Sequence, residues 1–335
     1  MITDFIQKMI DRVDLTEQEA RAAMDEIMAG QASDAQIAGF LTALRMKGET
    51  SQELVGFARV MREKAEPLWD GEILPVLDTC GTGGDRSGTF NISTATAFVA
   101  AAAGLRVAKH GNRSATSRCG SADVIEALGI DIQMPMERLR RAIKDAGLGF
   151  LFAQRFHTSM KHVMPTRSQL KVRTVFNILG PLANPAGARF QVVGVYSPEI
   201  MELMANALHG LNIDHAFVVH GANGMDEISI SSRTYVVEMH RGEIRQFVIS
   251  PEDFDLIPVK IDAIAGGDAA ENAKIIESIF RGERGPRRDV VLLNSAPAMV
   301  AGGAAKTWKE GLQLAAEAID SGAALRKLGE LREFL

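Results

Sequence analysis

Cysteine is nearly absent from the sequence, which contains only Cys80 and Cys119 among 335 residues. Two cysteines give no disulfide framework, and their spacing is not that of a metal site. We therefore expect each thiol to fill a small space in a reducing compartment. No stretch reaches the roughly 18 apolar residues of a membrane span, and the charged start, "MITDFIQKMIDRVDL", is unlike a signal peptide. These absences predict a cytoplasmic protein with no membrane partner.

An excess of basic residues is also missing. Lysine and arginine number 37 against 42 acidic residues, and the formal net charge is -5. Because nucleic-acid-binding proteins usually carry a basic excess or a basic stripe, we expect no nucleic-acid partner. The densest basic run, residues 281–289, is short and is interrupted by Glu283 and Asp289, so we expect a solvated loop there.

Residues 1 to about 70 carry the pattern of successive helices. The apolar side chains of residues 5–13, for example, fall on one helical face. Caps and stop signals divide the rest of this region into further helices. These signals are Thr16 with Glu19, Gly30, Ser33, Gly48 and Pro67. We interpret the segment as a compact helical domain.

Beyond residue 70, strand-like and helix-like stretches alternate. Strands are expected at 73–80, 106–111, 148–153, 188–197 and 215–221, and helices at 94–104, 121–129 and 134–147. Residues 234–250 have the pattern of a hairpin turning at Arg241-Gly242, and residues 289–305 that of a strand followed by the start of a helix. This alternation predicts an α/β domain with a mostly parallel central sheet.

Residues 165–185 interrupt the alternation, because they look helical and end in a loop punctuated by proline. We expect this region, up to about residue 188, to rejoin the N-terminal helices. The predicted fold class is therefore α/β. A small helical domain is expected at 1–70 with about 165–188, and a larger α/β domain at 71–164 and 189–335.

The first candidate site is the glycine-rich stretch "DTCGTGGDRSGTFNISTATA", residues 78–97. It follows an expected strand and precedes an expected helix, the place where parallel sheets bind ligands. Glycines let a ligand approach the backbone, and a helix N-terminus favours anions. Residues 81–94 therefore suit a phosphate or pyrophosphate. A plain strand-to-helix turn capped by Ser93 would show the same pattern.

A second polar loop, "KHGNRSATSRCGS" at residues 109–121, also lies between an expected strand and an expected helix. Lys109, His110 and Arg113 bring positive charge, and Asn112 is among its hydrogen-bonding side chains. The alternative is an ordinary solvated loop. Two such glycine-bearing loops after expected strands, about thirty residues apart, could face one polyanionic ligand.

Two further candidates are an acidic pair and an arginine. Asp226 and Glu227 follow an expected strand, and carboxylate oxygens are the ligands of the Mg²⁺ that often accompanies phosphorylated substrates. Such pairs are also common on protein surfaces. Arg167, with His157 nearby, could grip a carboxylate, although an interface arginine would look the same.

Taken in order, these stretches resemble the anthranilate phosphoribosyltransferase family of tryptophan biosynthesis. The matching motifs are "GTGGD" at 81–85, "NISTA" at 91–95, "KHGNRS" at 109–114, "GSADVIEALG" at 120–129, "RTVFNILGPLANP" at 173–185 and "DE" at 226–227. The similarity spans nearly the whole chain. It departs from the family pattern at Cys119, where a small or polar residue is expected.

The resemblance implies a fold like that of the nucleoside phosphorylases and phosphoribosyltransferases, with the active site between the two domains. It implies transfer of the phosphoribosyl group of 5-phosphoribosyl 1-pyrophosphate (PRPP) to the amine of anthranilate, with release of pyrophosphate and with Mg²⁺ as cofactor. It also implies a homodimer joined through the helical domain. No general base can be named from the motifs.

The resemblance implies roles for individual residues as well. PRPP would be bound by Gly81, Gly84, Asp85, Thr89, Asn91, Ile92, Ser93, Thr94, Lys109, His110, Gly111, Asn112, Arg113, Ser114, Ala115, Thr116, Ser117 and Ser121. Anthranilate would contact Gly81, Asn112 and Arg167, and also His110, His157 and Pro181 lining its pocket. Magnesium would be held by Ser93, Asp226 and Glu227.

Two alternatives stay open at this point. A pyrimidine nucleoside phosphorylase would share the architecture, but its lysine loop resembles "KHS" followed by glycines, whereas this sequence has "KHGNRS". A relative that lost catalysis and binds nucleic acid should show a basic groove and degraded motifs. The net charge of -5 and the intact motifs disfavour it.

Overall fold

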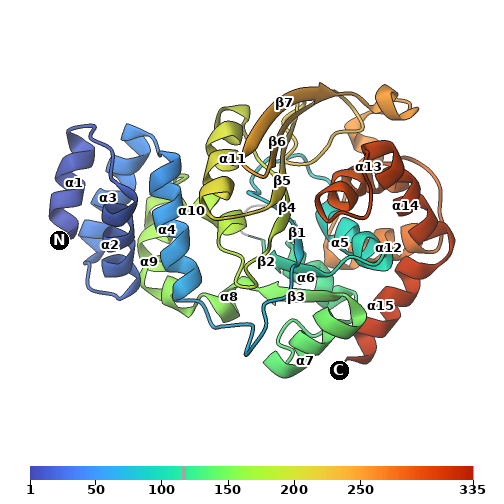
Figure 1. The fold of residues 1–335 in the computed structure, drawn as a ribbon, viewed down its shortest axis with the longest axis horizontal. Coiled ribbons are helices and arrows are strands. Elements are labelled where there is room, and N and C mark those ends of the chain that lie inside the picture. Colours follow the sequence, from blue (N-terminus) through green and yellow to red (C-terminus); the bar gives the residue numbers. More distant parts are fainter. Residues whose placement is uncertain (115–117, 335) are drawn as a thin grey trace.

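The computed structural model describes residues 1–114 and 118–334. A seven-stranded sheet lies between a bundle of helices that includes the N-terminus and a second group of helices that includes the C-terminus (Figure 1). No helix among the described residues is both long and apolar enough to cross a membrane.

Four helices form the N-terminal part: α1 (Ile2–Ile10), α2 (Glu17–Met28), α3 (Asp34–Lys47) and α4 (Ser51–Glu63). The expected caps are present, since the hydroxyls of Thr16 and Ser33 accept hydrogen bonds from the amides three residues on. Gly48 ends α3 with a φ of 92°, a conformation that side chains other than glycine rarely adopt. The helices enclose their own apolar centre, where the rings of Phe40 and Phe57 lie 5.9 Å apart.

The sheet contains β1 (Leu77–Gly81), β2 (Val107–Gly111), β3 (Leu148–Phe152), β4 (Phe190–Gly194), β5 (His215–Gly221), β6 (Thr234–His240) and β7 (Glu243–Ile249). The strand order is β3-β2-β1-β4-β5-β6-β7, and β1 to β5 are parallel. The expected hairpin is confirmed, because β6 and β7 are antiparallel and turn at Arg241 and Gly242. The strand order reverses between β1 and β4, which makes the carboxyl ends of these strands the expected crevice for a ligand.

Helices cover both faces of the sheet. One face is packed by α5 (Ile92–Ala102), α13 (Pro286–Ala301), α14 (Trp308–Asp320) and α15 (Ala323–Glu333), while α11 (Met201–Gly210) lies on the other face beside α4 (Figure 1). The other α-helices of the described residues are α6 (Ser121–Ala127), α7 (Met136–Arg141), α8 (Ala153–Phe156), α9 (Met164–Leu170), α10 (Phe176–Leu179) and α12 (Ala269–Phe280). The predicted class, a helical domain beside a mostly parallel α/β domain, is confirmed.

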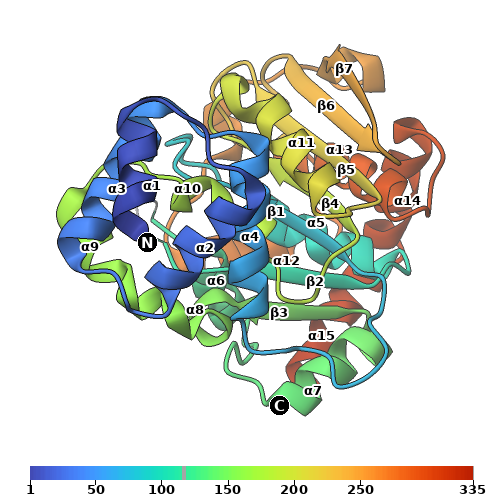
Figure 2. The same ribbon diagram turned by 60° about the vertical axis from the view of Figure 1, so that its left-hand side comes forward.

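The segment after β3 returns to the N-terminal helices. Helix α9 packs on α3, and α10 lies against α4 (Figure 2). Thr166 of α9 donates to the carboxylate of Asp34 at 3.1 Å, and Arg62 of α4 donates to the carbonyl of Leu182 at 2.7 Å. The interruption seen in the sequence at 165–185 thus corresponds to a crossing toward the helical bundle.

The expectation of a strand at 289–305 is wrong, because residues 286–301 form the single helix α13. Gly285 and Pro286 start this helix, and its apolar side chains are buried on nearly all sides, so no helical stripe marks it in the sequence. The expected solvated loop at 281–289 is wrong in its second half for the same reason. Arg288 is buried in the first turn of α13 and pairs with Asp320 at 2.8 Å.

Candidate active site

The glycine-rich loop leaves the carboxyl end of β1 and runs to the start of α5. Gly83, Gly84 and Gly88 have φ values of 65°, 77° and 71°, in the left-handed region that favours glycine. The N-cap of α5 is Asn91, and Ser93 lies inside the first turn, so the interpretation of Ser93 as a cap is wrong. Instead, the carbonyl of Ser93 accepts a hydrogen bond from the hydroxyl of Thr79 at 2.9 Å.

The acidic pair reaches this loop from the segment that follows β5. The Oδ2 atom of Asp226 accepts a hydrogen bond from the amide of Gly83 at 2.7 Å. The Oε1 atom of Glu227 accepts one from the amide of Ser93 at 3.1 Å, and the amide of Asp226 donates to Asp85 at 3.3 Å. These bonds join the acidic pair to the glycine-rich loop and to the first turn of α5, although the two regions lie about 140 residues apart in the chain.

Glycines at the ends of two strands make this approach possible. A Cβ atom at Gly194, the last residue of β4, would overlap the backbone oxygen of Asp226. A Cβ atom at Gly81 would lie 2.9 Å from the Oδ2 atom of Asp226. The sequence analysis singled out Gly81 but not Gly194. Only the position of the loop after β5 shows that residue 194 has no room for a side chain.

The two carboxyl groups are buried in an environment that disfavours their charge. Burial raises the pKa of Asp226 well above its ordinary value, and the nearby charges of Asp85 and Glu227 raise it further. Burial raises the pKa of Glu227 to about 7, although Lys109 acts in the opposite direction. Together with the hydroxyl of Ser93, these carboxyl groups provide oxygen atoms of the kind that bind Mg²⁺. Too little positive charge surrounds the two carboxyl groups to balance them, so a magnesium ion fits this place.

Lys109, on β2, is buried on the other side of this cluster. Its ammonium group donates to the carbonyl of Thr79 and, at 3.3 Å, to the hydroxyl of Ser93. Burial lowers the pKa of Lys109, while Asp78 and Glu227 favour its charged form. Lys109 therefore supports the first turn of α5 from inside the protein.

Asp78 and Asn184 form a buried support that the sequence analysis missed. Asp78 accepts hydrogen bonds from the amide of His110 at 3.1 Å and from the side chain of Asn184 at 2.7 Å. Asn184 also donates to the carbonyl of Ala108 at 2.9 Å. Asn184 lies inside the motif at 173–185 and Asp78 begins the glycine-rich stretch at 78–97, but their spacing in the sequence could not reveal the contact.

The second polar loop follows β2. The side-chain oxygen of Asn112 accepts a hydrogen bond from Gln154 at 3.2 Å, and its carbonyl accepts one from the hydroxyl of Ser121 at 3.3 Å. Arg113 pairs with Asp123 and Glu126 of α6 at 2.9 and 2.6 Å. The guanidinium group of Arg113 is thus paired with two carboxylates. The candidates Ala115, Thr116 and Ser117 lie outside the described residues.

Thr89 and Asn91 link the glycine-rich loop to other segments. Thr89 forms an isolated β-bridge with Ala265. Asn91 donates to the carbonyl of Cys119 at 3.3 Å and accepts from Asn272 at 2.9 Å. These contacts tie the start of α5 to the second polar loop and to α12, and they place Cys119 beside the candidate site.

His110 and His157 lie together, with ring centroids 5.1 Å apart. Burial lowers the pKa of His110 to about 3 and the pKa of His157 to about 4, so both rings are neutral at pH 7. The Nδ1 atom of His110 lies within hydrogen-bond distance, 3.2 Å, of the carbonyl oxygen of Gly180, the residue before Pro181. These predicted pocket residues are therefore neighbours.

Two arginines lie in the segment around α9 and α10, and one of them contacts the glycine-rich loop. Arg167 lies over the ring of Phe176 at 5.2 Å, and burial lowers its pKa. Arg173, which the sequence analysis did not single out, lies over the ring of Tyr196 at 4.0 Å and donates to the carbonyl of Gly84. Arg173 thus connects this segment to the glycine-rich loop.

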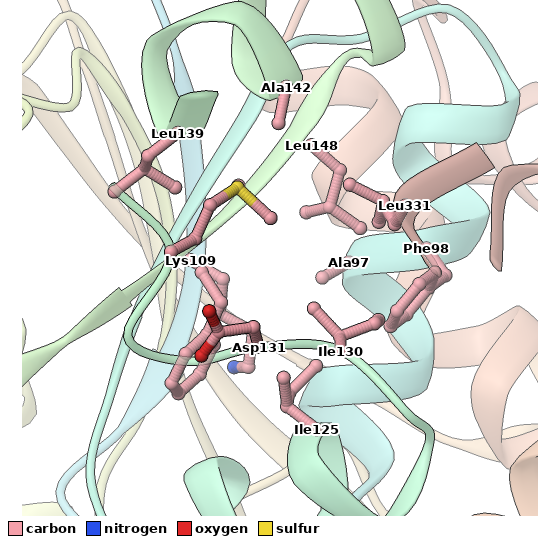
Figure 3. Close-up of a pocket in the computed structure, with 13 residues that line it drawn as sticks. Ala97, Phe98, Lys109, Ile125, Ile130, Asp131, Leu139, Ala142, Leu148 and Leu331 are labelled. Atoms are coloured by element: carbon pink, nitrogen blue, oxygen red, sulfur yellow. The ribbon is translucent and has the colours of Figure 1, made fainter. Parts of the chain in front are cut away.

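A small cavity lies between β2, β3 and α5, and Lys109 of the candidate site is among its lining residues (Figure 3). Its volume is about 20 Å³, roughly the space of one water molecule. The lining is mainly apolar, with Lys109 and Asp131 as its charged members. It belongs to the core and is too small for a substrate.

Comparison with known proteins agrees with both parts of the fold. Residues 3–65 match the family described as "Glycosyl transferase family, helical bundle domain", and residues 74–325 match "Glycosyl transferase family, a/b domain". The chain is therefore a glycosyltransferase of this two-domain class. Anthranilate phosphoribosyltransferases of Symbiobacterium thermophilum and Pelotomaculum thermopropionicum are 53% and 52% identical to it, over 98% and 100% of this chain and 96% of each relative.

Solved structures agree as well. The anthranilate phosphoribosyltransferase of Thermus thermophilus superimposes with a TM-score of 0.93 at 45% identity over 99% of both chains. The Saccharomyces cerevisiae enzyme in complex with PRPP and Mg gives a TM-score of 0.91 at 30% identity, covering 99% of this chain and 97% of that one. The chain belongs to the anthranilate phosphoribosyltransferase family.

Proposed function

We propose that the protein transfers the phosphoribosyl group of PRPP to the amine of anthranilate, giving N-(5-phosphoribosyl)anthranilate and pyrophosphate in tryptophan biosynthesis. The observation that carries this proposal is the meeting of the glycine-rich loop, the start of α5 and the Asp226–Glu227 pair. The family membership of the full chain supports it, and so does a yeast relative that binds PRPP and Mg. Anthranilate consumption in the presence of PRPP and Mg²⁺ is the direct test.

The PRPP site is assigned to the two polar loops. The amides of Thr82, Gly83 and Ser93 already donate to Gly194, Asp226 and Glu227. Other backbone amides of the glycine-rich loop and of the first turn of α5 would donate to the pyrophosphate, as helix N-termini and glycine loops do for anions. Side chains of the loop after β2 would bind the rest of the ligand. The residues proposed are Gly81, Gly84, Asp85, Thr89, Asn91, Ile92, Ser93, Thr94, Lys109, His110, Gly111, Asn112, Arg113, Ser114, Ala115, Thr116, Ser117 and Ser121.

Ser93, Asp226 and Glu227 would hold Mg²⁺, because their oxygens gather in one buried, carboxylate-rich place. When bound, the ion would supply positive charge opposite the pyrophosphate. The carboxylates would repel pyrophosphate if they met it directly, so we assign them to the metal. Their hydrogen bonds to the amides of Gly83 and Ser93 also fix the loop that binds the leaving group.

The anthranilate pocket is assigned to Gly81, Asn112 and Arg167, with His110, His157 and Pro181 as lining. The two histidines are neutral, so they suit an aromatic ring better than a carboxylate. Arg167 is left to bind the carboxylate. The amine of anthranilate is a weak nucleophile, so positioning it over the ribose carbon matters more than proton abstraction. Amides of the glycine-rich loop would stabilise the charge that gathers on the departing pyrophosphate.

We also propose the domain limits and the assembly. The helical domain would comprise residues 1–70 with about 165–188, in keeping with the packing of α9 on α3. A homodimer would form through this helical domain. Exposed apolar side chains on the domain, among them Ile10, Val13 and Met46, support this assembly. Sedimentation of the purified protein measures whether it is a dimer. The cytoplasmic location stays a prediction.

Replacing Arg167 by alanine is expected to raise the KM for anthranilate by about 10- to 100-fold. This factor corresponds to the free energy that one charge-assisted hydrogen bond contributes to binding. The KM for PRPP should change little. Steady-state kinetics with each substrate varied in turn measures both values. Gln169→Ala, an exposed position on the same helix, is the matched control. An unchanged KM for anthranilate in Arg167→Ala would remove Arg167 from this role.

Replacing Arg173 by alanine is expected to raise the KM for PRPP by about tenfold, because the glycine-rich loop loses its hydrogen bond to this side chain and the contact with Tyr196. Arg173→Lys should recover little, since an ammonium group cannot both stack and donate as a guanidinium does. Arg138→Ala, on the surface of α7, is the control. A KM for PRPP equal to that of the control would show that Arg173 does not position the loop.

A further inference from the structure

His215, Glu238 and His240 bring three metal-binding side chains together on the sheet, with one donor atom of each within 4.8 Å of the others. We propose that they form a binding site for a transition-metal ion of the zinc class. His215 on β5 lies directly opposite His240 on β6. Glu238 precedes His240 by two residues and therefore points to the same face of the sheet.

The distances fit this use with little movement. The Nε2 atom of His215 lies 2.8 Å from the Oε1 atom of Glu238, and the rings of His215 and His240 are stacked 4.2 Å apart. A zinc ion lies about 2.0–2.2 Å from nitrogen and carboxylate ligands, which holds tetrahedral donors roughly 3.4 Å from one another. Since His240 is exposed, rotation of its side chain can supply the difference.

The site is buried at His215 and open to solvent at His240. His215 is buried, and its ring lies 4.9 Å from that of Phe217, which in turn packs edge-on against Trp308. Glu238 is half-buried. Arg245, which lies opposite Glu238 in the sheet, forms an ion pair with Glu243 at 3.0 Å. An ion could therefore enter past His240 and keep water in its fourth position.

This site is separate from the proposed active site. His215 begins β5, whereas the acidic pair follows Gly221 at its other end, about 20 Å away at 3.3 Å per residue. The ligands also differ, because imidazole nitrogens suit zinc-like ions and carboxylate and hydroxyl oxygens suit Mg²⁺. A bound ion would join the hairpin of β6 and β7 to β5.

The test is a calorimetric titration with Zn²⁺ of protein that was first stripped of bound metal and then supplied with a large excess of Mg²⁺, which occupies the oxygen ligands. We expect about one Zn²⁺ to bind per chain and the unfolding temperature to rise with Zn²⁺. His240→Gln and Glu238→Gln should each weaken the affinity at least about tenfold, since even residues that only support a metal ligand contribute 10- to 100-fold.

His209→Gln is the matched control, because His209 is an exposed histidine on α11, which packs on the other face of the sheet. It should bind Zn²⁺ like the unaltered protein. Circular dichroism confirms that each variant is folded. The proposal is overturned if the unaltered protein binds no Zn²⁺ in the presence of Mg²⁺. It is equally overturned if His240→Gln and Glu238→Gln both bind Zn²⁺ as tightly as the unaltered protein.

Discussion

In the double variant Asp226→Asn with Glu227→Gln, the magnesium-dependent turnover is expected to fall at least about 100-fold. Removal of one preorganised electrostatic contact from an active site has an effect of this size. The amides keep the shape of the carboxylates and can still accept hydrogen bonds from Gly83 and Ser93. They remove the negative charge that would attract the cation. Activity measured across a range of Mg²⁺ concentrations gives both the turnover and its metal dependence.

The structure of this double variant should survive the substitution. The replaced carboxyl groups are buried with raised pKa values, so their charge does not favour the folded state, and the unfolding temperature without Mg²⁺ should not fall. Glu252→Gln, in an exposed turn after β7, serves as the control. If the double variant keeps both its activity and its metal dependence, the metal assignment is wrong.

Replacing Lys109 by methionine is expected to destabilise the protein by about 3–5 kcal/mol, as expected when one member of a buried charged cluster is removed. The carbonyl of Thr79 loses its hydrogen bond, and the buried carboxyl groups of Asp78 and Glu227 lose the cation that favours their ionised forms. Differential scanning calorimetry should show a clearly lower unfolding temperature, and turnover should fall as the first turn of α5 loosens.

Lys274→Met provides the comparison for Lys109→Met. Lys274 is exposed on α12, and a surface substitution there should change the stability by no more than about 0.5 kcal/mol. Equal unfolding temperatures for the two variants would mean that the buried ammonium group does not hold the cluster together.

Much of the fold could be predicted because local signals agree with the tertiary structure. Thr16 and Ser33 cap helices that the apolar pattern also marks, and Arg241-Gly242 turns the predicted hairpin. Helix α13 could not be predicted in this way. Its apolar side chains face the core on nearly all sides, so the 3.6-residue period that separates a helix from a buried strand is lost.

The candidate site was predictable as a set of motifs but not as a set of contacts. The sequence indicates that Gly81 and Asp226 both follow strands, yet nothing local shows that the loop after β5 passes close to Gly194. The bond from Asn184 to Asp78 likewise joins residues 106 positions apart. Such pairs are set by the strand order of the sheet, which places β1 between β2 and β4.

The most direct test follows the fluorescence of anthranilate with the purified protein, PRPP and Mg²⁺. The proposed function predicts that anthranilate is consumed and pyrophosphate released in equal amounts, and only when both PRPP and Mg²⁺ are present. Thymidine or uridine with inorganic phosphate should give no reaction. Anthranilate left unconsumed under these conditions, or phosphorolysis of either nucleoside in its place, would contradict the proposed function.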